Sequence, residues 1–357
     1  MSAYASQRQD RQVDWLVALT VVVSWALVFL LVLAVRPGGA AGVMWFDDVA
    51  LLLTALAAAA VAALAARRDW GSRRGLAWAF IATGLLMNAF GEAAWAVQEL
   101  ALGKEDVFPS VADAGYLGLY LPVFVGLLLM PQAPATGLRR LKMTFDVLIG
   151  IGAVAAVSSV LVVDSVLRDS GASVLERGIG LAYPLADIGV VFAVLVLLGR
   201  NGRSAGAGSL LFLALGFGSI AFSDSLYTYL TYSGDYASGS YIDAGWIGGY
   251  GLVTLAAAMS AYRQAGTEAA VAEKEEPAFA WQPLAMYAPV ALMGAALLGD
   301  HALRDGVLFV VFLLIAGLMF LRQFLAHLEN VSLNHRLAAA TVQLEQKVRS
   351  QSLELWK

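Results

Sequence analysis

The chain has 357 residues, of which 60% are hydrophobic and only 14% are charged. Soluble domains carry roughly 25% charged residues, so this composition excludes an ordinary water-soluble protein and indicates that lipid is the solvent. The formal net charge of −4 is small and argues against a nucleic-acid partner. The absence of cysteine from the sequence excludes disulfides, thiolate metal sites and a cysteine nucleophile.

Apolar segments long enough to cross a bilayer recur along the chain. The first, 14–35, is too long for a signal-peptide core and has no cleavage site after it. We predict an all-α fold, a polytopic membrane bundle of about ten transmembrane helices, because each span needs about 20 apolar residues. The expected spans are 14–35, 45–66, 75–99, 109–130, 142–163, 178–198, 207–231, 239–261, 282–299 and 304–326.

The positions of Lys and Arg predict which side of the membrane each connection faces. If the N-terminus is cytoplasmic, most basic residues fall on the cytoplasmic side, where membrane proteins concentrate them. The pattern predicts a multi-pass protein of the bacterial cytoplasmic (inner) membrane with both termini cytoplasmic. The few basic residues on the outer side are Arg36, Lys104, Arg168, Arg177 and Arg304.

Four regions follow from these spans. Residues 1–261 form an eight-helix membrane core, 262–281 a cytoplasmic linker, 282–326 a transmembrane hairpin and 327–357 a cytoplasmic signalling helix. Apolar and polar residues in the last region alternate spacings of four and three, which is typical of a coiled coil. We therefore expect a homodimer formed through this helix, with an amphipathic helix on the membrane surface as the alternative. The seam residues are Leu337, Thr341, Leu344, Val348, Gln351 and Leu355.

The core contains an internal repeat. Residues 113–120 read Asp-Ala-Gly-Tyr-Leu-Gly-Leu-Tyr, and residues 243–250 read Asp-Ala-Gly-Trp-Ile-Gly-Gly-Tyr. The preceding spans also match, since Ala-Phe-Gly-Glu at 89–92 corresponds to Ala-Phe-Ser-Asp at 221–224. The copies are an even number of spans apart, which predicts a parallel repeat rather than the inverted repeat of many transporters. A weaker third copy contains Asp187.

Acids and aromatic residues recur near the outer end of each copy. Asp113, Tyr116 and Tyr120 are spaced by three and four residues, which places them on one helix face. We predict an outward-facing pocket with acidic groups and aromatic walls, suited to a cation, an amine or a small amphipathic molecule. The candidate ligand-binding residues are Glu92, Trp95, Asp113, Tyr116, Tyr120, Asp187, Asp224, Tyr227, Asp243, Trp246 and Tyr250.

A purely local role for some of these residues is the alternative interpretation. Ser110 and Ser240 precede Asp113 and Asp243 with capping-box spacing, although Asp replaces the usual Glu or Gln. The aromatic residues could form an interfacial belt. Capping does not explain acids near helix C-terminal ends, where the helix dipole disfavours them. Glu92 and Asp224 occupy such positions and are therefore the stronger functional candidates.

No catalytic motif stands out in the sequence. It contains no Walker A loop, no HExxH zinc motif and no GxSxG nucleophile elbow. We expect neither a cofactor nor a metal site, and the sequence leaves open whether the protein has enzymatic activity.

Three segments carry a resemblance to a known group of proteins. They are Pro-Ser-Val-Ala-Asp at 109–113 followed by Tyr116, Tyr-Pro-Leu-Ala-Asp at 183–187, and Leu-Glu-Gln-Lys-Val-Arg at 344–349. Together they resemble the multi-helix N-terminal membrane sensor regions of bacterial GGDEF and EAL diguanylate cyclases and of membrane histidine kinases. The resemblance covers most of residues 45–355. The output motifs are not among these 357 residues, so cyclase or kinase activity would belong to a domain outside them.

Three functions remain open from the sequence. The preferred one is a membrane sensor, with links to cyclic di-GMP signalling implied by the resemblance, that detects an unknown small ligand near the outer leaflet. A secondary transporter of a cation or small amine is the main alternative. A non-catalytic membrane scaffold is the third. Membrane lipid is an expected partner in each case.

Overall fold

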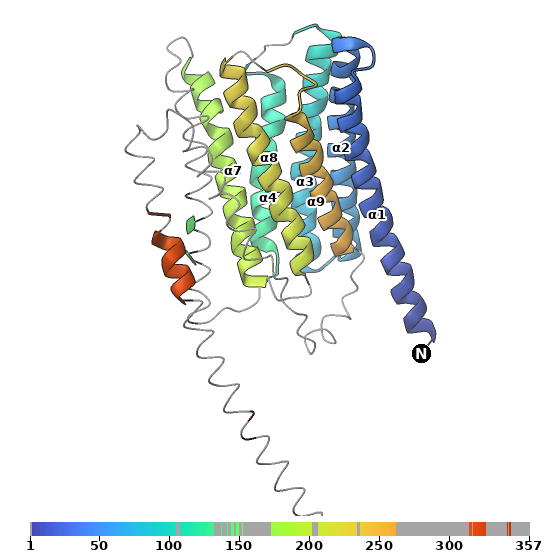
Figure 1. Ribbon diagram of the computed structural model, residues 1–357, viewed down its shortest axis with the longest axis vertical. Coiled ribbons are helices and arrows are strands. Elements are labelled where there is room, and N and C mark those ends of the chain that lie inside the picture. The colour runs from blue at the N-terminus through green and yellow to red at the C-terminus, as the bar shows by residue number, and fades with distance from the viewer. Residues whose placement is uncertain are drawn as a thin grey trace, which may run out of the picture.

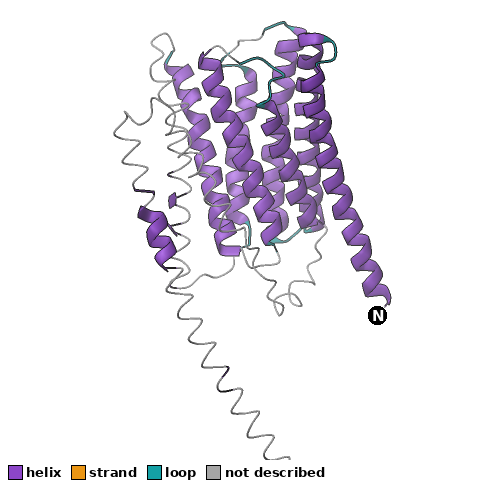
Figure 2. Cartoon of the chain, viewed as in Figure 1, coloured by secondary structure: helices purple, strands orange, loops and turns teal. Residues whose placement is uncertain are grey.

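A computed structural model describes residues 2–104, 108–131, 173–201, 206–233 and 236–261, with short stretches elsewhere of which 317–325 is the longest. Within these residues all regular structure is helical (Figure 2), which confirms the predicted all-α class. Seven helices are long and apolar enough to cross a bilayer, and the chain is a multi-pass membrane protein. The helices are α1 (Ser2–Val35), α2 (Gly39–Arg68), α3 (Arg73–Ala96), α4 (Val111–Leu129), α7 (Val174–Asn201), α8 (Ala207–Ser233) and α9 (Asp243–Ala261), with a short π-helix η1 (Val97–Ala101) continuing α3.

Seven predicted spans coincide with these helices. The remaining ones, 142–163, 282–299 and 304–326, lie wholly or largely outside the described residues, as do the linker 262–281 and the predicted coiled coil 327–357. The helix α1 begins at Ser2, well before the predicted span, and α2 begins at Gly39 rather than near residue 45. As a result, acids predicted at the start of that span lie about two turns inside the helix.

Six of the helices form a closed ring. Each contacts two neighbours, in the order α2, α3, α4, α7, α8, α9 and back to α2, while α1 packs outside the ring against α9 and α2 (Figure 1). We call the end where α3 finishes and α4 begins the acidic end. The opposite end, where α2 finishes with Arg67 and Arg68 and α3 begins with Arg73 and Arg74, is the basic end.

Each helix turns one stripe of residues toward the centre of the ring. On α3 this stripe is Trp78, Ile81 and Leu85, followed toward the acidic end by Asn88 and Glu92. All five are buried and their spacing alternates between three and four, as in left-handed helix bundles. The stripe therefore changes from apolar to polar partway along the helix, and the other five helices show the same change.

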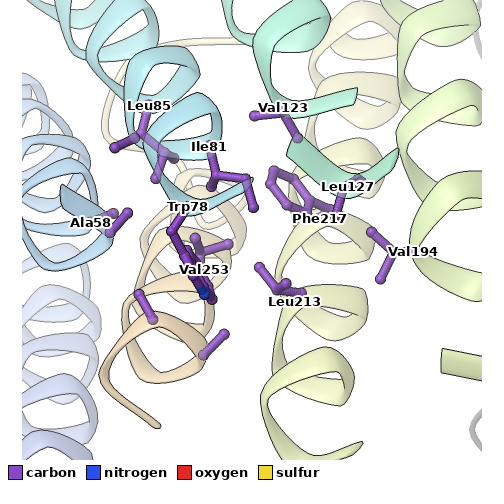
Figure 3. Close-up of a cluster of buried hydrophobic side chains, with 14 of the residues drawn as sticks. Ala58, Trp78, Ile81, Leu85, Val123, Leu127, Val194, Leu213, Phe217 and Val253 are labelled. Atoms are coloured by element: carbon purple, nitrogen blue, oxygen red, sulfur yellow. The ribbon is translucent and has the colours of Figure 1, made fainter. Parts of the chain in front are cut away.

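The apolar part of the stripes fills the ring between its middle and its basic end. All six helices contribute side chains to it, and those labelled in Figure 3 are at most 4% exposed. At the basic end the indole Nε1 of Trp78 donates a 2.7 Å hydrogen bond to Ser260 Oγ. We call the following residues the apolar core: Ala58, Trp78, Ile81, Leu85, Val123, Leu127, Val194, Leu213, Phe217 and Val253.

The two copies of the sequence repeat have equivalent packing. In the α3–α4 hairpin, a Cβ added to Gly115 would collide with the backbone of Gly91. In the α8–α9 hairpin, a Cβ added to Gly245 would collide with the hydroxyl of Ser223, which matches Gly91. Small residues thus bring both pairs of helices into close contact.

The correspondence between the two repeat copies extends to two units of three helices each. In ring order, α2–α3–α4 is followed by α7–α8–α9, and α7 lies against α4 as α2 lies against α9. Tyr183, early in α7, contacts Asp113, early in α4, so α4 and α7 run in the same direction. Since consecutive helices within each unit alternate in direction, each helix of one unit runs in the same direction as its counterpart in the other. The described core therefore has approximate two-fold symmetry about the axis of the ring.

Candidate functional site

The predicted site residues gather at the acidic end. They come from five helices of the ring, and most are buried. Their acids belong to one larger group, which we call the acidic cluster: Asp47, Asp48, Glu92, Glu99, Asp113, Asp187, Asp224 and Asp243.

Glu92 and Asp224 occupy matching positions and have matching hydrogen-bond donors. Tyr116 Oη donates to Glu92 Oε2 at 3.1 Å, and Trp246 Nε1 donates to Asp224 Oδ1 at 2.7 Å. In each hairpin an aromatic donor on the second helix therefore reaches the acid near the end of the first. Asn88 Nδ2 adds a longer contact of 3.4 Å to Glu92 Oε1.

Asp113 and Asp243 are helix caps and also members of the network. Asp113 Oδ2 accepts from the backbone N of Ser110 at 2.6 Å in a capping box, and Asp243 Oδ2 accepts from the backbone N of Ser240 at 2.8 Å. The other oxygen of each carboxylate faces a tyrosine. Tyr183 Oη donates to Asp113 Oδ1 at 2.7 Å. Each carboxylate therefore caps its helix and also contacts a tyrosine outside the capping box, and its role in ligand binding stays a prediction.

A second tyrosine fills the corresponding role at Asp243. Tyr236 lies in the connection before α9, and its hydroxyl donates to Asp243 Oδ1 at 3.2 Å. Burial, and next the charge of Asp243, raises the pKa of the Tyr236 phenol well above its ordinary value. The phenol thus stays protonated and remains a donor. Its ring contacts that of Tyr227 edge-on, with 4.6 Å between the ring centroids, and the rings of Tyr227 and Trp246 have centroids 5.7 Å apart.

Tyr120 joins three helices of the ring. Its hydroxyl, on α4, lies 2.7 Å from Asp187 Oδ1 on α7 and 2.9 Å from Asp224 Oδ2 on α8. Tyr250 is the matching residue on α9 and is 2% exposed. Its electrostatic partners include Glu92, Asp224 and Asp187. Tyr120 therefore links α4 of the first unit to two acids of the second unit.

Three acids of the cluster were not among the predicted ligand-binding residues. Glu99, in η1, is 5% exposed and accepts from Trp95 Nε1 and Ser238 Oγ, both at 2.8 Å. Asp47 and Asp48, on α2, are 1% and 3% exposed. Asp47 interacts electrostatically with Asp243, and Asp48 with Glu99 and Glu92.

The cluster contains no compensating cation in the described part of the chain. None of its carboxylates forms an ion pair with a described Lys or Arg, and the ion pair of Arg74 with Asp69 lies at the basic end. Within the cluster, three buried oxygens have no hydrogen-bond partner among the described residues: Asp47 Oδ1, Asp48 Oδ2 and Asp187 Oδ2. An unpaired buried anion costs several kcal/mol. Such a carboxyl group is stabilised if it is protonated or if a cation lies beside it.

The arrangement of the acids bears on whether the cluster could bind a metal ion. Among the described residues, no group of three or more acids or histidines is arranged to hold a metal ion. The side chains of the acidic end contact one another through hydrogen bonds and aromatic ring contacts. The outward-facing pocket predicted from the sequence therefore stays a prediction.

The comparisons with known proteins add no relative. The chain matches no family model, no curated protein and no solved structure. Its function has to be argued from the acidic cluster and the helices that hold it.

Proposed function

We propose that this chain is the membrane sensor module of a bacterial signalling protein, with the acidic cluster as the site that responds to the signal. One observation supports this most directly. Polar side chains link the helices at one end of the ring, while the apolar core fills the remainder with side chains from all six helices. A change at the acidic end would therefore alter contacts between helices without opening a polar path through the ring.

The hydrogen bonds of the cluster are suited to such a response. Tyr120 and Tyr183 each connect α4 with α7, and Tyr120 also reaches α8. A bound cation or a proton changes which of these carboxylates accept hydrogen bonds, and so changes the preferred distance between helices. A ligand shifts such an equilibrium only through its different affinity for two states, and coupling of about 1–3 kcal/mol is typical.

The remainder of the proposal extends beyond the described residues. With the ten predicted spans, the acidic end would face the outside and the basic end the cytoplasm. The basic residues Arg67, Arg68, Arg73 and Arg74 at the basic end support this orientation. The last span would continue into the signalling helix 327–357, pair with a second copy, and pass the change to a GGDEF-type cyclase or a kinase. Sequence pattern and resemblance support this part.

Disulfide cross-linking tests the proposed transmission. The chain has no cysteine, so Leu344→Cys in the predicted seam gives a single thiol. Its dimer cross-linking rate would be measured in membrane vesicles for the parent chain and with Glu92→Gln or Asp224→Asn added. We expect a change of about 5- to 150-fold, the range that corresponds to ordinary coupling energies.

The matched control neutralises an acid outside the cluster. Asp69→Asn removes a carboxylate at the basic end and should leave the cross-linking rate unchanged. Equal rates in all four chains would contradict the sensor proposal and favour a scaffold that only holds partners.

A secondary transporter is the second candidate, because buried acids without a cation are also suited to carrying one. The apolar core and the parallel arrangement of the two units are the observations against it. Uptake of a labelled monovalent cation into vesicles that disappears in Glu92→Gln and in Asp224→Asn would establish transport. Uptake equal to that of empty vesicles would exclude it for that cation.

A further inference from the structure

The hydroxyl of Tyr120 lies between two carboxyl groups. It is 2.7 Å from Asp187 Oδ1 and 2.9 Å from Asp224 Oδ2, both of which are hydrogen-bond distances. Tyr120 is 8% exposed and Asp187 is 4% exposed, so bulk water does not substitute for either contact. The three residues come from α4, α7 and α8 and link the two units of the ring.

The number of protons follows from these two distances. A tyrosine hydroxyl has one hydrogen and can donate it to one acceptor at a time. If both carboxyl groups were ionised, one of the two contacts would bring a hydroxyl lone pair against a negative oxygen. Both contacts are favourable only if one carboxyl group is protonated and donates to the Tyr120 oxygen. The pair therefore binds one proton.

The neighbours of each acid indicate where that proton resides. Asp224 has two donors available, Tyr120 and the indole of Trp246 at 2.7 Å, and such contacts stabilise an anion. Among the described residues, Asp187 has one hydrogen-bond contact, that to Tyr120, and its Oδ2 has no partner. A neutral acid loses far less than an anion from an unpaired buried oxygen.

We propose that Asp187, Tyr120 and Asp224 form a proton-binding site in which Asp187 carries the proton and donates it to Tyr120, and Tyr120 donates to an ionised Asp224. Other titratable groups also face this site. Tyr250 of α9 interacts with both acids, and Glu92 of α3 interacts with Asp224. Tyr183, one turn before Asp187 on α7, interacts with Asp224 and is hydrogen-bonded to Asp113 of α4. Among the described residues, none of the groups facing the site is a Lys, Arg or His.

Loss of the proton has a direct structural consequence. Two anions would then compete for one hydroxyl. Their repulsion would act between α7 and α8, and Tyr120 of α4 would lose one of its two contacts. The inference names the proton as the ligand of the acidic cluster, and in that respect it rests on the proposed sensor function. The proton site itself depends only on the geometry of the three residues.

Infrared spectroscopy of the full chain in lipid nanodiscs tests the site, with the proton itself as the probe. A protonated buried carboxyl group gives a carbonyl band that shifts in D₂O. We expect this band in the parent chain and in Asp69→Asn, and the loss of one such band in Asp187→Asn. Tyr120→Phe removes the hydroxyl that accepts from Asp187 and donates to Asp224. Asp187 then loses its acceptor but keeps its proton, so the band should remain and move to higher frequency.

Each outcome has a defined meaning once circular dichroism shows that a variant is folded. An undiminished band in Asp187→Asn overturns the proposal, as does an unchanged frequency in Tyr120→Phe. If Asp187→Asn fails to fold, Tyr120→Phe alone decides.

A different result would contradict the sensor proposal while leaving the proton site intact. If the band behaves as expected but Leu344→Cys cross-linking is the same at all pH values and in all acid variants, the proton site stands and the transmission does not.

Discussion

The acidic end and the apolar core belong to the same six helices but are held together differently. In the core, mostly apolar side chains from every helix meet, and contact depends on shape and volume. The indole N–H of Trp78, bonded to Ser260 at the basic end, is the polar group of this set. At the acidic end, individual hydrogen bonds such as Tyr120–Asp187 and Tyr183–Asp113 connect the helices. Packing of the first kind is insensitive to solution conditions, whereas bonds to carboxyl groups depend on protons and cations. One ring therefore contains a fixed part and a responsive part.

The largest expected effect comes from placing an acid in the fixed part. Phe217, on α8, is 4% exposed and lies two turns from Asp224, within the apolar core. Phe217→Asp would bury a carboxylate where no donor is available, and we expect a loss of at least about 3 kcal/mol of stability. Thermal unfolding in detergent, followed by circular dichroism, measures it.

The control for this change keeps the site apolar. Phe217→Leu reduces volume without adding charge and should cost distinctly less than Phe217→Asp. Similar stabilities for the two variants would show that the core tolerates charge, and the distinction between the two parts of the ring would be lost.

The second prediction compares the two hairpins of the repeat. A Cβ at position 115 meets the backbone of Gly91, which cannot move without separating α3 from α4. A Cβ at position 245 meets the Ser223 hydroxyl, which can rotate and give up its 3.2 Å hydrogen bond to the Ile242 carbonyl. Gly115→Ala should therefore lower stability by about 1–3 kcal/mol, and Gly245→Ala by less. The reverse order of unfolding temperatures would contradict the repeat as described.

The periodicity of the sequence was sufficient to predict much of this arrangement. On α3, Leu85, Asn88 and Glu92 have the three- and four-residue spacing of one helix face. The match between the two copies of the repeat identified Glu92 and Asp224 as equivalent residues. What periodicity could not supply were contacts between helices distant in the chain. The position of Asp187 beside Tyr120 requires that α7 lie next to α4, which no local pattern specifies.

Two omissions from the predicted site have specific causes. Asp47 and Asp48 were expected at a helix start, where acids commonly interact with the helix dipole, but α2 begins earlier and carries them into the ring. Glu99 lies near a helix end, where an acid is normally solvated. It is buried because Ser238, from a connection more than a hundred residues later, reaches it. A charged residue in the inward stripe was the available signal for both.

The third prediction concerns the donors of the acidic end. Trp246→Phe removes the indole N–H that contacts Asp224 and leaves a partly buried carboxylate with one donor fewer. The expected loss is about 1–3 kcal/mol. If the indole acts through this carboxylate, Trp246→Phe should cost less in an Asp224→Asn background, where no anion is left without its donor. A double-mutant cycle measured by thermal unfolding gives the coupling, and strictly additive effects would exclude it.

The smallest effect is expected for a partly exposed acid that already has a cation beside it. Asp69 and Arg74 pair at 3.5 Å at the basic end, with side chains 16% and 21% exposed. Such pairs contribute about 0–1 kcal/mol, so Asp69→Asn should barely change the unfolding temperature. The small difference should shrink further as salt is added, because exposed charges are screened more than buried ones. Neutralising variants in the buried acidic cluster should keep their effects under the same salt. A salt response in Asp187→Asn as large as that in Asp69→Asn would mean that solvent reaches the acidic cluster as readily as the surface.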